Sequence, residues 1–129
     1  MVDYFDLYKQ VLIVIREERP RDGQSLIKEM NQKNVILEAL NEGVGSDLLV
    51  QFTFETLENL IEENLIKGKI VRTKEGTLYT IEHLTTAGHQ YLQYTKDPTT
   101  KEKIKSVLRE EGIPMTPQAL TKVIARLVL

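Results

Sequence analysis

The stretch from residue 53 to residue 92, TFETLENLIEENLIKGKIVRTKEGTLYTIEHLTTAGHQYL, constrains the fold of this chain more than any other. Apolar side chains recur at three- and four-residue spacing over residues 53–65, which predicts an amphipathic helix with Thr53 as its N-cap. Residues 69–73 and 77–81 are rich in β-formers, and Gly76 between them can take the positive φ of a tight hairpin. A helix followed directly by an antiparallel hairpin is therefore expected.

A second helix follows the hairpin. It is opened by Leu84-Thr85-x-x-Gly88-His89, in which Thr85 can cap a helix that runs to about residue 94.

The first helix is predicted over residues 4–18, with Asp3 as its cap and Pro20 as its stop. Its apolar residues form so broad a stripe that we expect a central core helix. Residues 24–52 predict two or three short helices, with Ser25 and Asn34 as caps. Gly43-x-Gly45 lacks the strand, third glycine and lysine of a phosphate loop, so it is interpreted as a turn. A short turn from Ser46 through residue 52 would precede the helix capped by Thr53.

Two more helices are expected after the break at Asp97-Pro98. Thr99-x-x-Glu102 is a capping box for a helix to residue 111, and Thr116-Pro117 is a start signal for the last helix. We predict one domain over residues 1–95 and a C-terminal helical extension over residues 96–129, in the same compact unit.

Helix, hairpin and Leu-Thr-x-x-Gly in this order predict an α+β fold, a winged helix-turn-helix with a two-stranded wing. The chain also resembles a family of small phage- and prophage-encoded proteins of unknown function. The resemblance rests on residues 4–19 and 54–129, including Leu84-Thr85-Thr86-Ala87-Gly88-His89 and the later Thr116-Pro117, while residues 24–52 depart from it. It implies a winged-helix fold and no catalytic residues. In the winged-helix regulators that the order of helix, hairpin and Leu-Thr-x-x-Gly also resembles, the glycine lets the following helix approach the sheet closely.

Composition excludes several classes of protein. The 129 residues contain no cysteine, which excludes disulfides, thiolate zinc sites and cysteine nucleophiles. No apolar run approaches the roughly 18 residues of a membrane span. The acidic N-terminus is unlike a signal peptide, so we expect a cytoplasmic protein without a membrane partner.

No catalytic, metal or cofactor site is predicted. His83 and His89 lie six residues apart across a strand–helix junction, which is no recognised metal spacing, and His89 is expected to pack on the hairpin. The carboxylates of Glu55, Glu58, Glu62 and Glu63 are interpreted as a solvated helix face. We therefore expect a protein that is not an enzyme.

Charge is unevenly distributed. Residues 1–68 carry 13 acidic and 7 basic side chains, whereas the remainder carries a net charge of +4. The basic residues of the wing suit phosphate contacts beside a DNA groove, although they also suit edge strands that discourage sheet pairing. These residues are Lys67, Lys69, Arg72 and Lys74.

Two functions remain open. The fold and the basic wing favour a DNA-binding regulator, which we rank slightly first. The acidic helix and an apolar C-terminal helix favour a protein-interaction module, such as a phage accessory factor. The last helix has an apolar stripe that either folds back on the first helix or forms a homodimer interface. The stripe consists of Leu120, Val123, Ile124 and Leu127.

Overall fold

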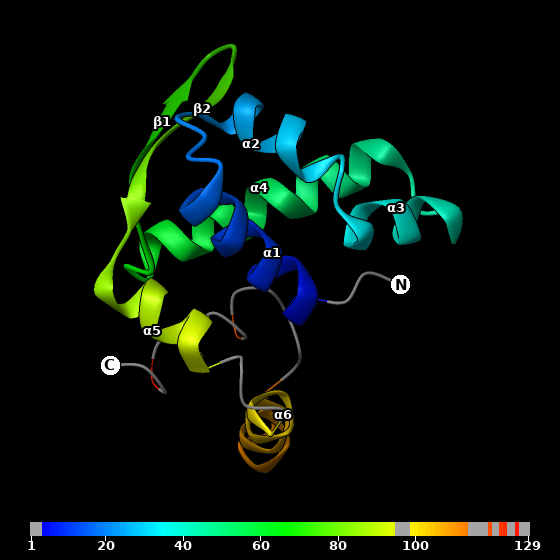
Figure 1. The fold of residues 1–129 in the computed structure, drawn as a ribbon, viewed down its shortest axis with the longest axis vertical. Helices are drawn as coiled ribbons and strands as arrows, with labels where there is room; N and C mark the ends of the chain where they lie inside the picture. The colour runs from blue at the N-terminus through cyan, green and yellow to red at the C-terminus, as the bar shows by residue number, and fades with distance from the viewer. Residues whose placement is uncertain (1–3, 95–98, 114–118, 120–121, 124–125, 127–129) are drawn as a thin grey trace.

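The computed structural model describes residues 4–94, 99–113, 119, 122–123 and 126. In this part of the chain the fold is α+β, with six helices and one two-stranded antiparallel sheet (Figure 1). The helices are α1 (Tyr4–Glu17), α2 (Gly23–Met30), α3 (Asn34–Asn41), α4 (Ser46–Glu62), α5 (Thr86–Tyr94) and α6 (Thr100–Glu110), and the strands are β1 (Ile66–Thr73) and β2 (Gly76–Leu84).

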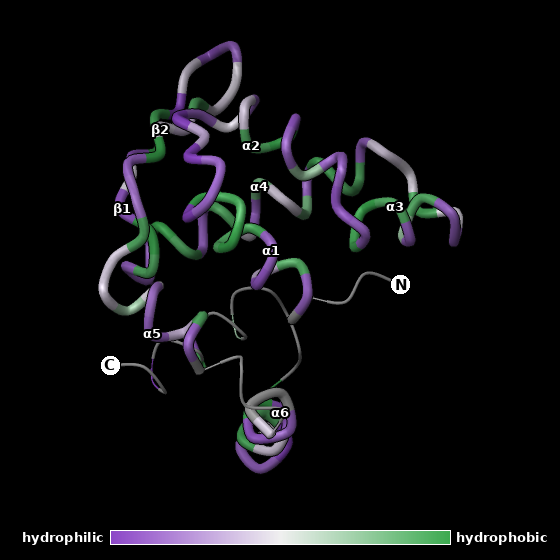
Figure 2. The backbone as a smooth tube through the Cα atoms, viewed as in Figure 1, coloured by the Kyte–Doolittle hydropathy of each residue, from purple (hydrophilic) through white to green (hydrophobic). Residues whose placement is uncertain are grey.

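Helix α1 is the central core helix that the sequence predicts. It packs against α2, α4, α5 and β2, and its apolar stripe is buried from Leu7 to Ile15. Figure 2 shows hydrophobic segments gathered where α1, α4 and the hairpin meet, and a hydrophilic hairpin tip. Burial of this stripe on several sides contributes hydrophobic stabilisation to the fold.

The antiparallel hairpin is confirmed, with strands longer than predicted. Ile70 pairs with Tyr79, and Arg72 pairs with Thr77. Gly76 has a φ of 138°, which is the positive value that the turn requires. The register shifts between Lys67 and Gly68.

A third chain segment lies beside β2. Asp22 forms an isolated antiparallel bridge with Thr80, and the Ile81 N–H donates to the Arg21 carbonyl at 2.8 Å. The order of the elements along the chain is compatible with a winged-helix layout. It consists of α1, the bridge at Asp22, helices α2 to α4, the hairpin and α5.

Helix α4 corrects one prediction. It begins at Ser46, so Thr53 lies in its interior and is not its cap. Thr53 is 1% exposed, and its hydroxyl donates to the Leu49 carbonyl one turn earlier, at 2.8 Å. A buried threonine in a helix satisfies its hydroxyl in this way, so α4 continues through the residue that we expected to start it.

The predicted caps of two other helices are also wrong. The carboxylate of Asp22, not the hydroxyl of Ser25, caps α2 by accepting from the Ser25 N–H at 2.8 Å. Lys33, not Asn34, is the N-cap residue of α3, without a side-chain bond. Thr99 is the N-cap residue of α6 as predicted, but its side chain makes no capping hydrogen bond.

Helix α5 approaches the start of the hairpin as expected. The Thr85 hydroxyl accepts from the Gly88 N–H at 3.2 Å and donates to the Asn64 carbonyl at 2.6 Å. A Cβ on Gly88 would lie 2.2 Å from the Leu65 carbonyl oxygen. Glycine at this position is therefore what permits the close approach.

The C-terminal part shares the core of the preceding elements. Ile104 and Leu108 of α6 and Val123 are buried in the same hydrophobic cluster as α1. Arg126 donates to both carboxylate oxygens of Glu111, at 3.2 and 2.8 Å. The predicted helix start at Thr116-Pro117 lies outside the described residues. Among those residues, no helix is long and apolar enough to cross a membrane.

Candidate interaction surface

The exposed face of α4 is acidic. The helix contains four carboxylates and no lysine, arginine or histidine. Asp47, Glu55 and Glu62 are exposed, whereas Glu58 is only partly so. The helix that directly precedes the hairpin therefore presents negative charge to whatever approaches it.

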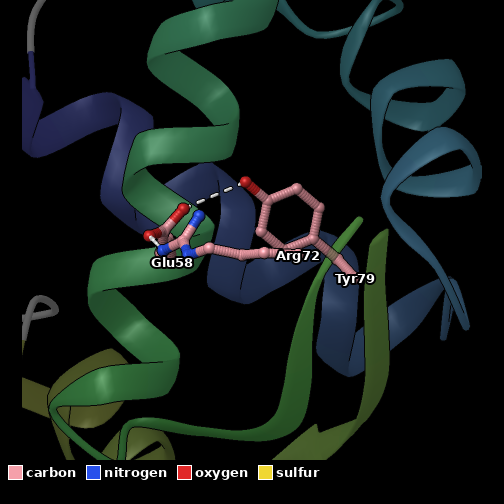
Figure 3. Close-up of polar contacts among 3 residues, drawn as sticks. All are labelled: Glu58, Arg72 and Tyr79. Carbon is pink, nitrogen blue, oxygen red and sulfur yellow. Dashed lines mark hydrogen bonds and ion pairs between the residues drawn. The ribbon is translucent and has the colours of Figure 1, made fainter. Parts of the chain in front are cut away.

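Glu58 is not the solvated surface residue that the sequence predicts. One of its oxygens accepts from the Arg72 guanidinium of β1, and the other accepts from the Tyr79 hydroxyl of β2 at 3.0 Å (Figure 3). The Glu58 side chain is 23% exposed, against 61% for Arg72. Arg72, which we predicted to contact phosphate, thus already has a carboxylate partner.

This carboxylate shifts the titration of both partners. The hydrogen bond to Glu58 raises the pKa of Arg72 above its ordinary value, and the negative charge of Glu58 adds to the effect. Burial, followed by the hydrogen bond to Glu58, raises the pKa of Tyr79 to about 12. Both raised pKa values favour the protonated donors of the two hydrogen bonds to Glu58.

The other predicted wing residues differ from Arg72. Lys67, Lys69 and Lys74 are exposed, and in the described part of the chain none of them forms an ion pair. They are positioned on or next to β1, and β1 packs against α4. The hairpin and α4 therefore offer charges of opposite sign.

An open groove of about 590 Å³ lies between α2, α4 and β2. We call it the α2–α4–β2 groove. The Phe54 and Tyr79 rings stack within it, with centroids 5.0 Å apart and planes at 21°. A Cβ on Gly23 would lie 2.8 Å from the Phe54 ring, so glycine allows α2 to start against the pair. The lining includes Gly23, Ile27, Val50, Phe54, Thr77 and Tyr79.

This groove was not predicted from the sequence. The position of Tyr79 in it could have been predicted from the hairpin, because residues two apart on a strand share a face. Counting outward from the turn at Gly76 places Tyr79 on the buried face with Ile81. The stacking partner Phe54 cannot be found in the same way, since it belongs to a helix whose start was misassigned.

The histidine predictions have mixed outcomes. His89 lies in the first turn of α5 but is exposed, so it does not pack on the hairpin. His83 is also exposed, and its Nδ1 lies 2.7 Å from the Leu84 carbonyl oxygen. Among the described residues, no three carboxylate or imidazole groups converge as metal ligands.

The predicted dimer residues lie mostly outside the described part of the chain. Val123 is described and is 1% exposed within a single chain. Leu120, Ile124 and Leu127 are not described. The dimer interface stays a prediction.

Comparison with family models, with curated proteins and with solved structures gives no match.

Proposed function

We propose that this chain is a winged-helix protein without catalytic activity, and that its α4 face binds a protein partner rather than duplex DNA. The layout supports the winged helix, because α4 directly precedes the hairpin and Arg21–Asp22 supplies a third strand position. In that fold the helix before the wing is the one that approaches a DNA groove. The charge of α4 therefore favours a protein partner over duplex DNA.

The observation that carries the proposal is the pairing of Arg72 with Glu58 on a helix that has no basic residue. Duplex binding draws its affinity from cations that replace phosphate counterions. Each carboxylate of α4 held about 6 Å from a phosphate would instead cost roughly 0.7 kcal/mol even in water. Breaking the Arg72–Glu58 pair to free one cation would add to this cost.

A second candidate function rests on the three remaining lysines. Lys67, Lys69 and Lys74 are exposed, and side chains of this kind can grip a phosphate backbone beside a groove. A wing that binds DNA without its preceding helix would give weak, sequence-independent binding.

A duplex titration distinguishes these functions. The folded chain is titrated into a fluorescent duplex of random sequence at low salt, up to tens of micromolar, where nonspecific binders form complexes. We expect no complex. A complex that weakens when Lys67, Lys69 and Lys74 are replaced by alanine, with a smaller salt slope, would put DNA binding first.

The protein-binding half of the proposal has its own test. A display library of random dodecapeptides is selected on the folded chain, and each enriched peptide is titrated against wild type and Glu55→Lys. We expect enriched peptides to be cationic and to bind Glu55→Lys several-fold more weakly at low salt. Glu38→Lys is the matched charge reversal on α3 and should bind like wild type. Peptides that ignore both substitutions, or the absence of enrichment, would count against the α4 face.

A further inference from the structure

We propose that the α2–α4–β2 groove binds an extended segment of a partner protein, with one apolar side chain on the Phe54–Tyr79 pair and a lysine or arginine beside Asp47 and Glu55. This inference rests on the proposed function and specifies its binding site and the chemistry of its partner.

The floor of the groove is apolar and only partly covered. Ile27, Val50 and Phe54 are each half-buried, so the chain leaves apolar surface accessible along α2 and α4. The stacked rings of Phe54 and Tyr79 form a flat base. A volume of about 590 Å³ lies in the range of pockets that enclose a ligand fragment or an anchoring side chain. An aliphatic or aromatic side chain would gain contact there.

The negative charges of Asp47 and Glu55 at the α4 rim favour a lysine or arginine next to the apolar side chain of the partner segment. Asp47 precedes Val50 by three residues, which is nearly one helical turn, and Glu55 follows Phe54 directly. Both carboxylates are exposed. On the α2 side, Asp22 lines the groove and Lys28 follows Ile27, so that rim carries charges of both signs, whereas the α4 side carries only negative charge. The complementary segment therefore has its lysine or arginine on the α4 side.

Backbone groups of β2 favour an extended segment over a helical one. The Ile81 N–H points away from β1 to the Arg21 carbonyl. Backbone N–H and C=O groups point to alternate sides along an antiparallel strand, so residues two or four positions apart share a side. The N–H and C=O of Thr77, four residues before Ile81, therefore also point away from β1. At Gly23 the chain turns into α2, so within the described residues no strand lies beside Thr77. An added strand would continue the position of Arg21–Asp22 and hold its side chains over the groove.

The test uses the enriched dodecapeptides with a matched pair of substitutions on α4. Val50→Ser removes apolar surface from the groove, and Leu48→Ser removes it from an exposed leucine outside the groove lining. Leu48→Ser loses more helix propensity than Val50→Ser, so weaker binding by Val50→Ser alone cannot come from a weakened helix. We expect Val50→Ser to weaken peptide binding roughly tenfold and Leu48→Ser to leave it within about twofold. Ile27→Ser is the second groove variant, and circular dichroism checks that each variant is folded.

The peptides themselves test the extended geometry. Enriched sequences should place a large apolar residue within two positions of a lysine or arginine. Backbone N-methylation should abolish binding at the one position whose N–H meets the Thr77 carbonyl and leave the positions on either side unaffected, because neighbouring N–H groups face away from β2. N-methylation that weakens binding equally at every position, or at none, would overturn the strand geometry.

The outcomes separate this inference from the function on which it rests. Some peptides could bind Glu55→Lys more weakly than wild type but bind Val50→Ser and Ile27→Ser like wild type. This result would support the α4 face as the binding surface and overturn the groove as the binding site. A loss with Leu48→Ser alone would move the site to the exposed leucines of α3 and the start of α4. Duplex binding without any enriched peptide would overturn both proposals.

Discussion

Glu58 links α4 to both strands of the hairpin through two donors of different kinds. Arg72 brings a charge, while Tyr79 brings a hydroxyl from a ring that is itself stacked on Phe54. A single carboxylate therefore fixes the orientation of the hairpin relative to the helix. The arrangement pairs one cation of the wing with a carboxylate and places an aromatic ring at the base of the groove.

The first prediction concerns alkaline pH. Burial and the hydrogen bond to Glu58 raise the pKa of Tyr79 to about 12 in the folded chain, above its ordinary value of 10.0. The folded state thus favours the protonated phenol, and this stabilisation is complete below pH 10 and is lost as the pH rises to about 12. Chemical denaturation at several pH values should show the free energy of unfolding falling across this window.

Tyr79→Phe is the control for that measurement. It keeps the ring but has no proton to lose, so its stability should fall less between pH 10 and 12 than that of wild type. Equal slopes in the two proteins would show that Tyr79 does not carry the effect.

The second prediction concerns Gly88. An alanine Cβ at this position would meet the Leu65 carbonyl oxygen at 2.2 Å, and backbone cannot move aside cheaply. Gly88→Ala should therefore lower the free energy of unfolding by about 1–3 kcal/mol or more. Gly45, the N-cap of α4, has no neighbour within 4 Å of an added Cβ. Gly45→Ser should leave stability within about 0.5 kcal/mol or raise it slightly. Thermal melting of both variants measures the contrast.

At the scale of elements, the hairpin could be predicted and the extent of α4 could not. The hairpin has a local signal, since two β-rich runs flank a glycine that takes positive φ. The start of helix α4 was placed at Thr53 because threonine favours N-cap positions in isolated helices. Its buried stripe is unbroken once threonine is counted as an inward residue, from Leu49 through Thr53, Thr56 and Leu57 to Leu60.

The same distinction applies to the candidate surface. The exposure of the lysines follows from their charge and could be predicted. The pairing of Arg72 with Glu58 joins residues 14 positions apart, across the end of a helix and a strand. No local pattern contains that contact, because it depends on where the hairpin folds back over α4.

The third prediction tests the role of Thr53. A helix-interior threonine whose hydroxyl bonds to the carbonyl one turn earlier can be replaced by the isosteric valine at little cost, whereas loss of a cap costs about 0.5–2 kcal/mol. We expect Thr53→Val to change the free energy of unfolding by less than about 0.5 kcal/mol. A larger loss in urea denaturation would contradict its interior position.

At the scale of the whole molecule, the fold brings together charges that the sequence keeps apart. Residues 1–68 carry a net charge of −6, and the remainder carries +4. Helix α4 belongs to the acidic part and β1 mostly to the basic part, yet they pack together. The result is a surface of mixed sign. Such a surface suits a polypeptide with its own charge pattern better than a uniformly negative duplex.

The final prediction concerns the C-terminal part, where a fold-back and a dimer interface were both open. Val123 is 1% exposed within one chain and belongs to the cluster that includes α1, which makes it a core residue of the monomer. Val123→Ala should lower the free energy of unfolding by about 1–3 kcal/mol. Lys122→Ala, at the exposed neighbouring position, should stay within about 0.5 kcal/mol of wild type. Sedimentation at low micromolar concentration should give the same mass for both variants and wild type. If Val123→Ala instead reduced the mass while melting like wild type, Val123 would belong to the predicted dimer interface and not to the core.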